Sequence, residues 1–140
     1  MPDMKIALDT NILIYFFEGI EPYASKVENI LNDFMKTKDE GIISTITMAE
    51  VLTGFYLAGD NKKAAKAKKL LNDLTLDNFK IVPVTFEIAD LAASLRAKRC
   101  GKLPDALIVA TAVNQSAALV YSQDKDLQRF NKDIKVQELP

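Results

Sequence analysis

The stretch that decides the fold is residues 5–14, which read KIALDTNILI. A short run ending in apolar residues leads into Asp9, and a second apolar run begins at Ile12. An ionised carboxylate at the edge of a protein core costs free energy unless it has a partner. The partner of Asp9 can be a helix N-terminus, a cationic side chain or a metal ion, and the rest of the chain has to decide among these.

The composition indicates one folded domain. The chain has 140 residues, of which 49% are hydrophobic and 26% charged, as expected for a soluble globular protein with a sizeable core. We therefore expect a single domain over residues 1–140. The net charge of −1 gives no global affinity for polyanions, so any contact with nucleic acid requires a local basic patch.

The residue types that are absent narrow the possible chemistry. The chain contains no histidine, which excludes imidazole acid–base catalysis, Ser-His-Asp and Cys-His nucleophiles, and histidine-ligated zinc sites. Its single cysteine, Cys100, excludes an intramolecular disulfide and suits a reducing compartment. Carboxylates, hydroxyls, lysine, arginine or a hard metal ion must carry any catalysis.

No apolar run approaches the roughly 20 residues that cross a bilayer. The apolar N-terminal region is interrupted by Asp9, Asn11 and Glu18 and lacks the pattern of a signal peptide. We expect a cytoplasmic protein without a membrane partner.

Short apolar runs alternate with helical patterns along the chain. The runs that predict strands are residues 4–8, 41–44, 79–84, 118–122 and, more weakly, 134–139. A helix is expected to begin near Asn11, and further helices are expected at residues 23–38, 47–58, 62–74, 86–100 and 104–116. This alternation favours an α/β domain with a mostly parallel sheet.

Ligands of such sheets bind outside the carboxyl ends of the strands. Asp9 directly follows the first predicted strand, and Asp124 follows the fourth after one residue, Gln123. Both carboxylates are therefore expected at the same edge of the sheet.

Each acidic residue of interest also has an ordinary explanation. Asp9 can cap a helix, and Asp105 stands in the first turn of a helix that opens with proline. Asp124 and Asp126 suit a turn. Glu50 lies with Thr47 and Gly54 on a narrow polar strip of an otherwise apolar helix, where it can face solvent or a cleft.

Together these carboxylates point to a metal ion. Several negative charges at one sheet edge raise one another's pKa and destabilise the fold unless a cation neutralises them. A ligand set of oxygens, without histidine or cysteine, selects Mg²⁺ or Mn²⁺ over zinc. A metal ion beyond Asp9 would explain why this carboxylate is tolerated.

Four blocks of the sequence resemble the PIN-domain ribonucleases, in particular the VapC-type toxins of toxin–antitoxin pairs. The blocks are ALDTNILIYF (residues 7–16), ISTITMAEVLTG (43–54), LPDALIVATAV (103–113) and LVYSQDKDLQRF (119–130). Each is a weak pattern alone, but their order and spacing in a chain of this length make the resemblance strong.

The resemblance implies a three-layer α/β/α domain with parallel strand order 3-2-1-4-5. It also implies an acidic metal-binding pocket made by Asp9, Glu50, Asp105 and Asp124. Supporting positions are Thr10, Asn11, Ser122 and Asp126, and the choice between Asp124 and Asp126 as the fourth ligand stays open.

The activity implied is hydrolysis of RNA phosphodiester bonds by one or two Mg²⁺ or Mn²⁺ ions, leaving 5′-phosphate and 3′-hydroxyl ends. The partners implied are an RNA substrate, a cognate antitoxin that offers an arginine to the pocket, and a second copy in a homodimer. The apolar residues that can belong either to such interfaces or to the core include Ile14, Phe16, Phe17 and Tyr56.

Two basic segments are candidates for binding RNA phosphates. Four cationic residues, Arg96, Lys98, Arg99 and Lys102, occupy seven positions just before Asp105, although cations also suit the end of a helix. The lysine-rich helix pattern at residues 62–69 is better explained as a solvated face.

Two other functions compete with the nuclease. A phosphatase or receiver domain with a phosphorylated aspartate also places Asp at strand ends, but the phosphatase needs a second Asp where Asn11 stands. A receiver domain needs an acidic pair near its N-terminus, which Asp3 and Asp9 do not supply. A non-catalytic PIN fold that only binds RNA or serves as a scaffold remains the alternative, although the presence of all four acidic residues argues against it.

Overall fold

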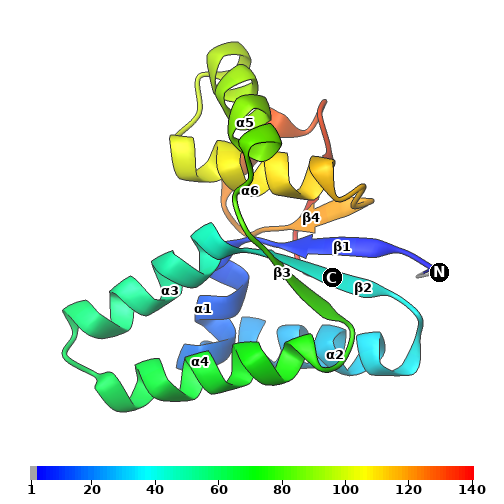
Figure 1. Ribbon diagram of the computed structural model, residues 1–140. Helices are drawn as coiled ribbons and strands as arrows, with labels where there is room; N and C mark the ends of the chain where they lie inside the picture. Colours follow the sequence, from blue (N-terminus) through cyan, green and yellow to red (C-terminus); the bar gives the residue numbers. More distant parts are fainter. Residues whose placement is uncertain (1–2) are drawn as a thin grey trace.

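A computed structural model describes residues 3–140 of the protein (Figure 1). Its sheet has five strands, β1 (Lys5–Leu8), β2 (Glu40–Ser44), β3 (Phe79–Val82), β4 (Leu119–Tyr121) and β5 (Lys135–Gln137). All neighbouring pairs are parallel and the order is β3-β2-β1-β4-β5. The predicted fold class and strand order are confirmed.

The helices agree with the sequence patterns to within a few residues. They are α1 (Thr10–Glu18), α2 (Tyr23–Lys36), α3 (Thr45–Leu57), α4 (Asn61–Thr75), α5 (Phe86–Arg99) and α6 (Leu103–Asn114). Asp124 and Asp126 were expected in a polar turn; Asp126 lies in the 3-10 helix η1 (Lys125–Phe130), and Asp124 directly precedes it.

For two of the element boundaries that differ from the prediction, the structure shows the reason. The third strand ends at Val82 rather than at residue 84, because Pro83 has no N–H to donate to the ladder. The third helix begins at Thr45 rather than at residue 47, because the Ser44 hydroxyl accepts the backbone N–H of Ile46 and caps the helix there.

Helices cover both faces of the sheet, with α5 and α6 on one side and α1 to α4 on the other (Figure 1). One buried cluster contains Leu13, Phe34 and Leu71, from the side of α1 to α4. The other contains Ile88, Val109 and Phe130, from α5, α6 and η1. The domain therefore has three layers, and no described helix is both long enough and apolar enough to cross a membrane.

The central strand delivers Asp9 to the carboxyl edge of the sheet. β1 pairs with both β2 and β4, and the backbone N–H of Asp9 still donates to the carbonyl of Tyr121 at 3.0 Å. The ends of β1 and β4 are thus held side by side. Residues that follow these two strands, and those that begin α3 and α6, meet at this edge.

Candidate functional site

Asp9 is a buried carboxylate whose two oxygens both accept hydrogen bonds. Its side chain is only 3% exposed and caps α1, since Oδ1 accepts the backbone N–H of Thr10 at 2.8 Å. Oδ2 accepts the Ser122 hydroxyl at 2.7 Å and the Asn11 amide at 3.2 Å. Asp9 therefore caps a helix, and its carboxylate is also fixed in place by polar neighbours.

Burial raises the pKa of Asp9 above its ordinary value. The hydrogen bonds from Ser122 and Thr10 act in the opposite direction, and the charges of Asp124 and Glu50 raise the pKa further. Both carboxylates are thus near enough to Asp9 to affect its ionisation, although all three come from distant parts of the chain.

A hydroxyl from α1 joins Asp9 to the glutamate of α3. The Thr10 hydroxyl donates to Oε1 of Glu50 at 2.6 Å and lies 3.2 Å from the hydroxyl of Thr47, which is fully buried. Glu50 as a whole is exposed. The polar strip on α3 thus faces the end of β1 and keeps one oxygen of Glu50 toward the site.

Ser122 organises the other side of the site. Besides donating to Asp9, its buried hydroxyl accepts the Asn11 amide at 3.2 Å and the backbone N–H of Asp124 at 3.0 Å. The Asn11 side-chain carbonyl in turn accepts the N–H of Gln123 at 3.2 Å. Asn11 and Ser122 therefore lock the segment that carries Asp124 against the start of α1.

Asp124 and Asp126 occupy different positions relative to the other carboxylates. Oδ1 of Asp124 accepts the backbone N–H of Asp126 at 2.9 Å, which makes Asp124 the cap of η1. Asp124 raises the pKa of both Asp9 and Asp105, whereas Asp126 is exposed and affects neither. The arrangement favours Asp124 as the fourth acidic residue of the site.

Asp105, in the first turn of α6, has the most perturbed ionisation in the site. Burial and the negative charges of Asp9, Asp124 and Glu50 raise its pKa to about 6, against a smaller lowering by Lys102. The charges of three other carboxylates affect the pKa of Asp105 because they lie close enough to interact with it electrostatically. The four residues expected at the site thus lie within electrostatic range of one another.

The oxygen atoms of the site are of the type that binds a hard divalent cation, but their present arrangement does not surround an ion. Carboxylate and hydroxyl oxygens are the ligands that Mg²⁺ and Mn²⁺ take, and the mutual repulsion of four acids is what a cation relieves. Within residues 3–140, however, no three acidic, cysteine or histidine side chains converge closely enough to hold an ion as they stand. Side-chain rotation of Glu50, Asp105 or Asp124 would be needed to complete the coordination shell of a cation.

The four basic residues before Asp105 have separate surroundings. Arg99 forms a two-point ion pair with Asp133, with Nε and Nη2 at 2.9 and 3.0 Å from the carboxylate oxygens. Arg96, Lys98 and Lys102 are exposed, and Lys102 is close enough to lower the pKa of Asp105. The role of all four in binding substrate stays a prediction.

Three long-range contacts are not signalled by any sequence pattern. The contact of Thr10 with Thr47 and Glu50 joins residues about 40 positions apart. The pairing of Arg99 with Asp133 spans 34 positions, and no local spacing signals it. No sequence pattern marks Arg129, whose guanidinium donates to the carbonyl of Cys100 at 2.6 Å and connects η1 to the end of α5.

The sequence matches the PIN domain family over residues 6–133, which is nearly the whole chain. The chain belongs to the PIN domain family. The predicted resemblance is thereby confirmed at the level of the family. No curated protein sequence matches the chain.

Solved structures similar to this PIN domain include several toxin–antitoxin proteins. A toxin–antitoxin complex from Klebsiella pneumoniae is 26% identical, with a TM-score of 0.69 over 96% of this chain and 98% of that one. FitAcB from Neisseria gonorrhoeae is 25% identical, with a TM-score of 0.68 over 94% and 95% of the two chains. VapC20 of Mycobacterium tuberculosis, described as a sarcin-ricin loop cleaving toxin, is 15% identical, with a TM-score of 0.68 over 88% and 92%. At 15% identity, the similarity to VapC20 concerns the fold alone.

Proposed function

We propose that this PIN domain is a Mg²⁺- or Mn²⁺-dependent endoribonuclease that hydrolyses RNA phosphodiester bonds. The observation that carries the proposal is the clustering of Asp9, Glu50, Asp105 and Asp124, since burial together with the charges of the other three raises the pKa of Asp105 to about 6. Four carboxylates at the carboxyl edge of a parallel sheet are placed where ligands of such sheets bind. The family and the similar toxins support the nuclease class.

The residues of the site have distinct roles in this proposal. Asp9, Glu50, Asp105 and Asp124 would hold the cation, whose chemistry is to lower the pKa of a water and stabilise negative charge on the phosphate. Thr10 orients Glu50, while Asn11 and Ser122 orient Asp9 and position the segment that begins at Asp124. Asp126 supports the turn through its backbone.

We further propose that the protein is the toxin of a VapBC-type pair and acts in the cytoplasm. In this proposal it forms a homodimer and binds a cognate antitoxin. Support comes from the similar structures, which include VapBC-1 of nontypeable Haemophilus influenzae and FitAB bound to a DNA fragment. Affinity purification of the tagged chain from its native cells, followed by size-exclusion chromatography and mass spectrometry, tests the partner. A toxin that is recovered only alone would contradict this part of the proposal.

Cleavage of end-labelled total RNA with Mn²⁺, with Mg²⁺ and with EDTA tests the nuclease. Losing a residue that only hydrogen-bonds to a metal ligand typically costs about 10- to 100-fold in activity. Asp9→Asn and Asp105→Asn change proposed ligands themselves, so each should reduce cleavage by more than that. Asp90→Asn, at an exposed acidic residue of α5 away from the site, is the matched control and should keep full activity.

The outcomes separate the nuclease from the scaffold. Metal-dependent cutting that the two site variants lose and the control retains would support the enzyme. A folded protein that neither cuts RNA nor binds Mn²⁺ in calorimetry would overturn it and leave a non-catalytic PIN scaffold.

A further inference from the structure

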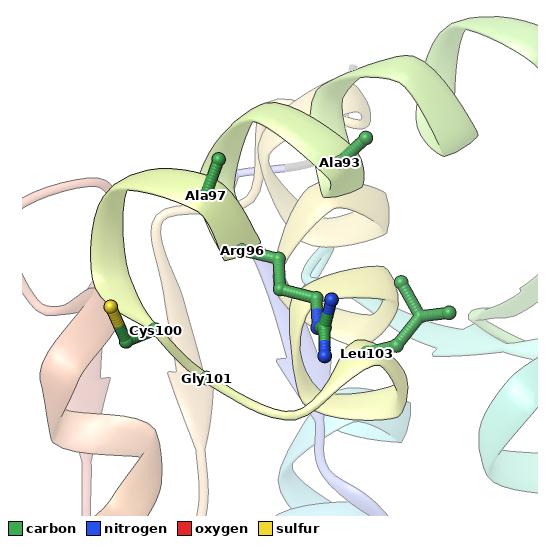
Figure 2. Close-up of a pocket in the computed structure, with 6 residues that line it drawn as sticks. All are labelled: Ala93, Arg96, Ala97, Cys100, Gly101 and Leu103. Atoms are coloured by element: carbon green, nitrogen blue, oxygen red, sulfur yellow. The ribbon is translucent and has the colours of Figure 1, made fainter.

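A hollow of about 480 Å³ lies where α5 ends and α6 begins, outside the carboxylate cluster. It is lined by Ala93, Arg96, Ala97, Cys100, Gly101 and Leu103. Figure 2 shows the Arg96 side chain reaching from α5 toward Leu103, with Ala93 and Ala97 above it and Cys100 at the other end. Nothing in the nuclease mechanism described above uses this hollow.

Arg96 is the charged side chain of the hollow, and its guanidinium is available to a ligand. Within residues 3–140 it makes no side-chain hydrogen bond and no ion pair, whereas the neighbouring Arg99 is held by Asp133 and Arg129 by backbone carbonyls. A planar guanidinium that is free to form two parallel hydrogen bonds suits a phosphate group. The structure therefore distinguishes Arg96 from the other two arginines nearby.

The floor of the hollow is fixed and partly apolar. A side chain at Gly101 would place its Cβ 2.7 Å from Cζ of Phe130, so the turn packs tightly on η1. The Cys100 carbonyl accepts the Arg129 guanidinium at 2.6 Å, which secures the same turn. Leu103 is 49% exposed and offers an apolar surface beside Arg96.

The hollow is adjacent to the acidic site along the chain. Leu103 and Lys102 stand two and three residues before Asp105, and the charge of Lys102 lowers the pKa of that carboxyl. A polyanion approaching four carboxylates is repelled unless cations hold its backbone nearby. Arg96 and Lys102 supply positive charge on the α5–α6 side of the cluster.

We propose that this hollow is a nucleotide subsite for the RNA strand, in which Arg96 binds a backbone phosphate and Leu103 contacts the attached ribose or base. The inference rests on the proposed function, because it takes RNA as the substrate. The subsite would hold a nucleotide near the one that is cut, and its phosphate lies outside the carboxylate cluster.

Fluorescence anisotropy with a fluorescein-labelled, single-stranded RNA of mixed sequence in EDTA tests the subsite without cleavage. Arg96→Met should weaken binding about 10-fold, the loss expected for one charge-assisted contact. It should also reduce the slope of log affinity against log salt by about 0.7, the value for one phosphate on a single strand. The matched control is Lys36→Met, which removes the same charge from an exposed position at the end of α2, in the opposite helical layer and outside the hollow.

A second pair of variants tests the hollow by its shape and charge. Ala97→Glu should place a negative group in the hollow and weaken binding at least as much as Arg96→Met. Ser94→Glu adds the same charge at an exposed position of α5 outside the hollow and should have less than a threefold effect. Circular dichroism should be unchanged in all four variants.

Equal losses in Arg96→Met and Lys36→Met, or no binding by the wild-type protein, would overturn the subsite. The nuclease assay distinguishes this failure from that of the proposed function. Metal-dependent cleavage with equal affinities of the two variants overturns the subsite alone. RNA binding that needs Arg96, without any cleavage, supports the subsite and contradicts the nuclease.

Discussion

At the scale of single residues, Asp9 shows how one side chain serves both the fold and the site. Its Oδ1 caps α1, and its Oδ2 accepts the Ser122 hydroxyl and the Asn11 amide. Burial disfavours the charged form, whereas the hydrogen bonds favour it. The carboxylate that the sequence places at the end of an apolar run is therefore tolerated through polar partners already present in the chain.

Ser122→Ala should destabilise the protein by about 1–3 kcal/mol, because it removes the shorter of two hydrogen bonds to Oδ2 of Asp9 and leaves the Asp124 N–H without its partner. It should also raise the pKa of Asp9 further, since the hydrogen bond that lowers this pKa is lost. Urea denaturation measures the free energy of unfolding. Ser94→Ala, at an exposed serine of α5, is the control and should change this free energy by less than about 0.5 kcal/mol.

Asp105 should make the protein less stable as pH rises. Its pKa is about 6 in the folded state, above the ordinary value of 3.8, so the folded state binds the proton more tightly than the unfolded state. The free energy of unfolding in EDTA should therefore fall between about pH 4 and pH 6 and level off above that range.

Asp105→Asn should remove this part of the pH dependence. After allowance for solvent screening, the variant should be about 1–2 kcal/mol more stable than wild type at pH 7.5 in EDTA. Thermal unfolding over pH 4–8 measures the difference. A variant whose stability follows the wild-type pH profile would show that Asp105 is not the group responsible.

At the scale of elements, the sequence patterns located the helices and strands but not the contacts between them. The spacing of apolar residues along the sequence identifies β1 and α3, because each element must bury its apolar side chains in the core. The order of parallel strands then places Asp9 and Asp124 at one edge, so these two site positions were predictable from topology. The pairing of Arg99 with Asp133 was not, because it depends on how η1 packs against α5.

η1 is attached to the end of α5 by Arg129. Its Nη1 donates to the carbonyls of Arg99 and Cys100, at 3.3 and 2.6 Å, and its Nε donates to the carbonyl of Asp126 at 3.0 Å. The turn before Asp105 and the helix that Asp124 caps are thereby connected. This contact helps to fix the distance between the two carboxylates.

Arg129→Gln should destabilise the protein by about 1 kcal/mol, because the carbonyls at the end of α5 lose a charged donor. The midpoint of thermal unfolding measures this effect. Lys132→Gln, which removes an equal charge from an exposed position, should leave the midpoint unchanged. Equal effects of the two substitutions would mean that net charge, and not the attachment of η1, explains the change.

At the scale of the whole molecule, the site joins the two helical layers across the end of the sheet. Thr10 and Glu50 come from the layer of α1 to α4, while Asp105 and the cap of η1 come from the opposite side. The two layers have separate buried clusters. A cation bound among these carboxylates would link both layers, so its binding should stabilise the entire domain.

Binding of Mn²⁺ should release a proton at mildly acidic pH, since a ligand carboxyl must be deprotonated. With the pKa of Asp105 at about 6, release should be substantial at pH 5.5 and small at pH 8. Calorimetric titration in two buffers with different ionisation enthalpies counts the protons released. Asp105→Asn should abolish the release at pH 5.5, whereas Asp90→Asn should retain it. Proton release that persists in Asp105→Asn would assign the titrating group elsewhere in the cluster, and binding without any release would exclude Asp105 as a ligand.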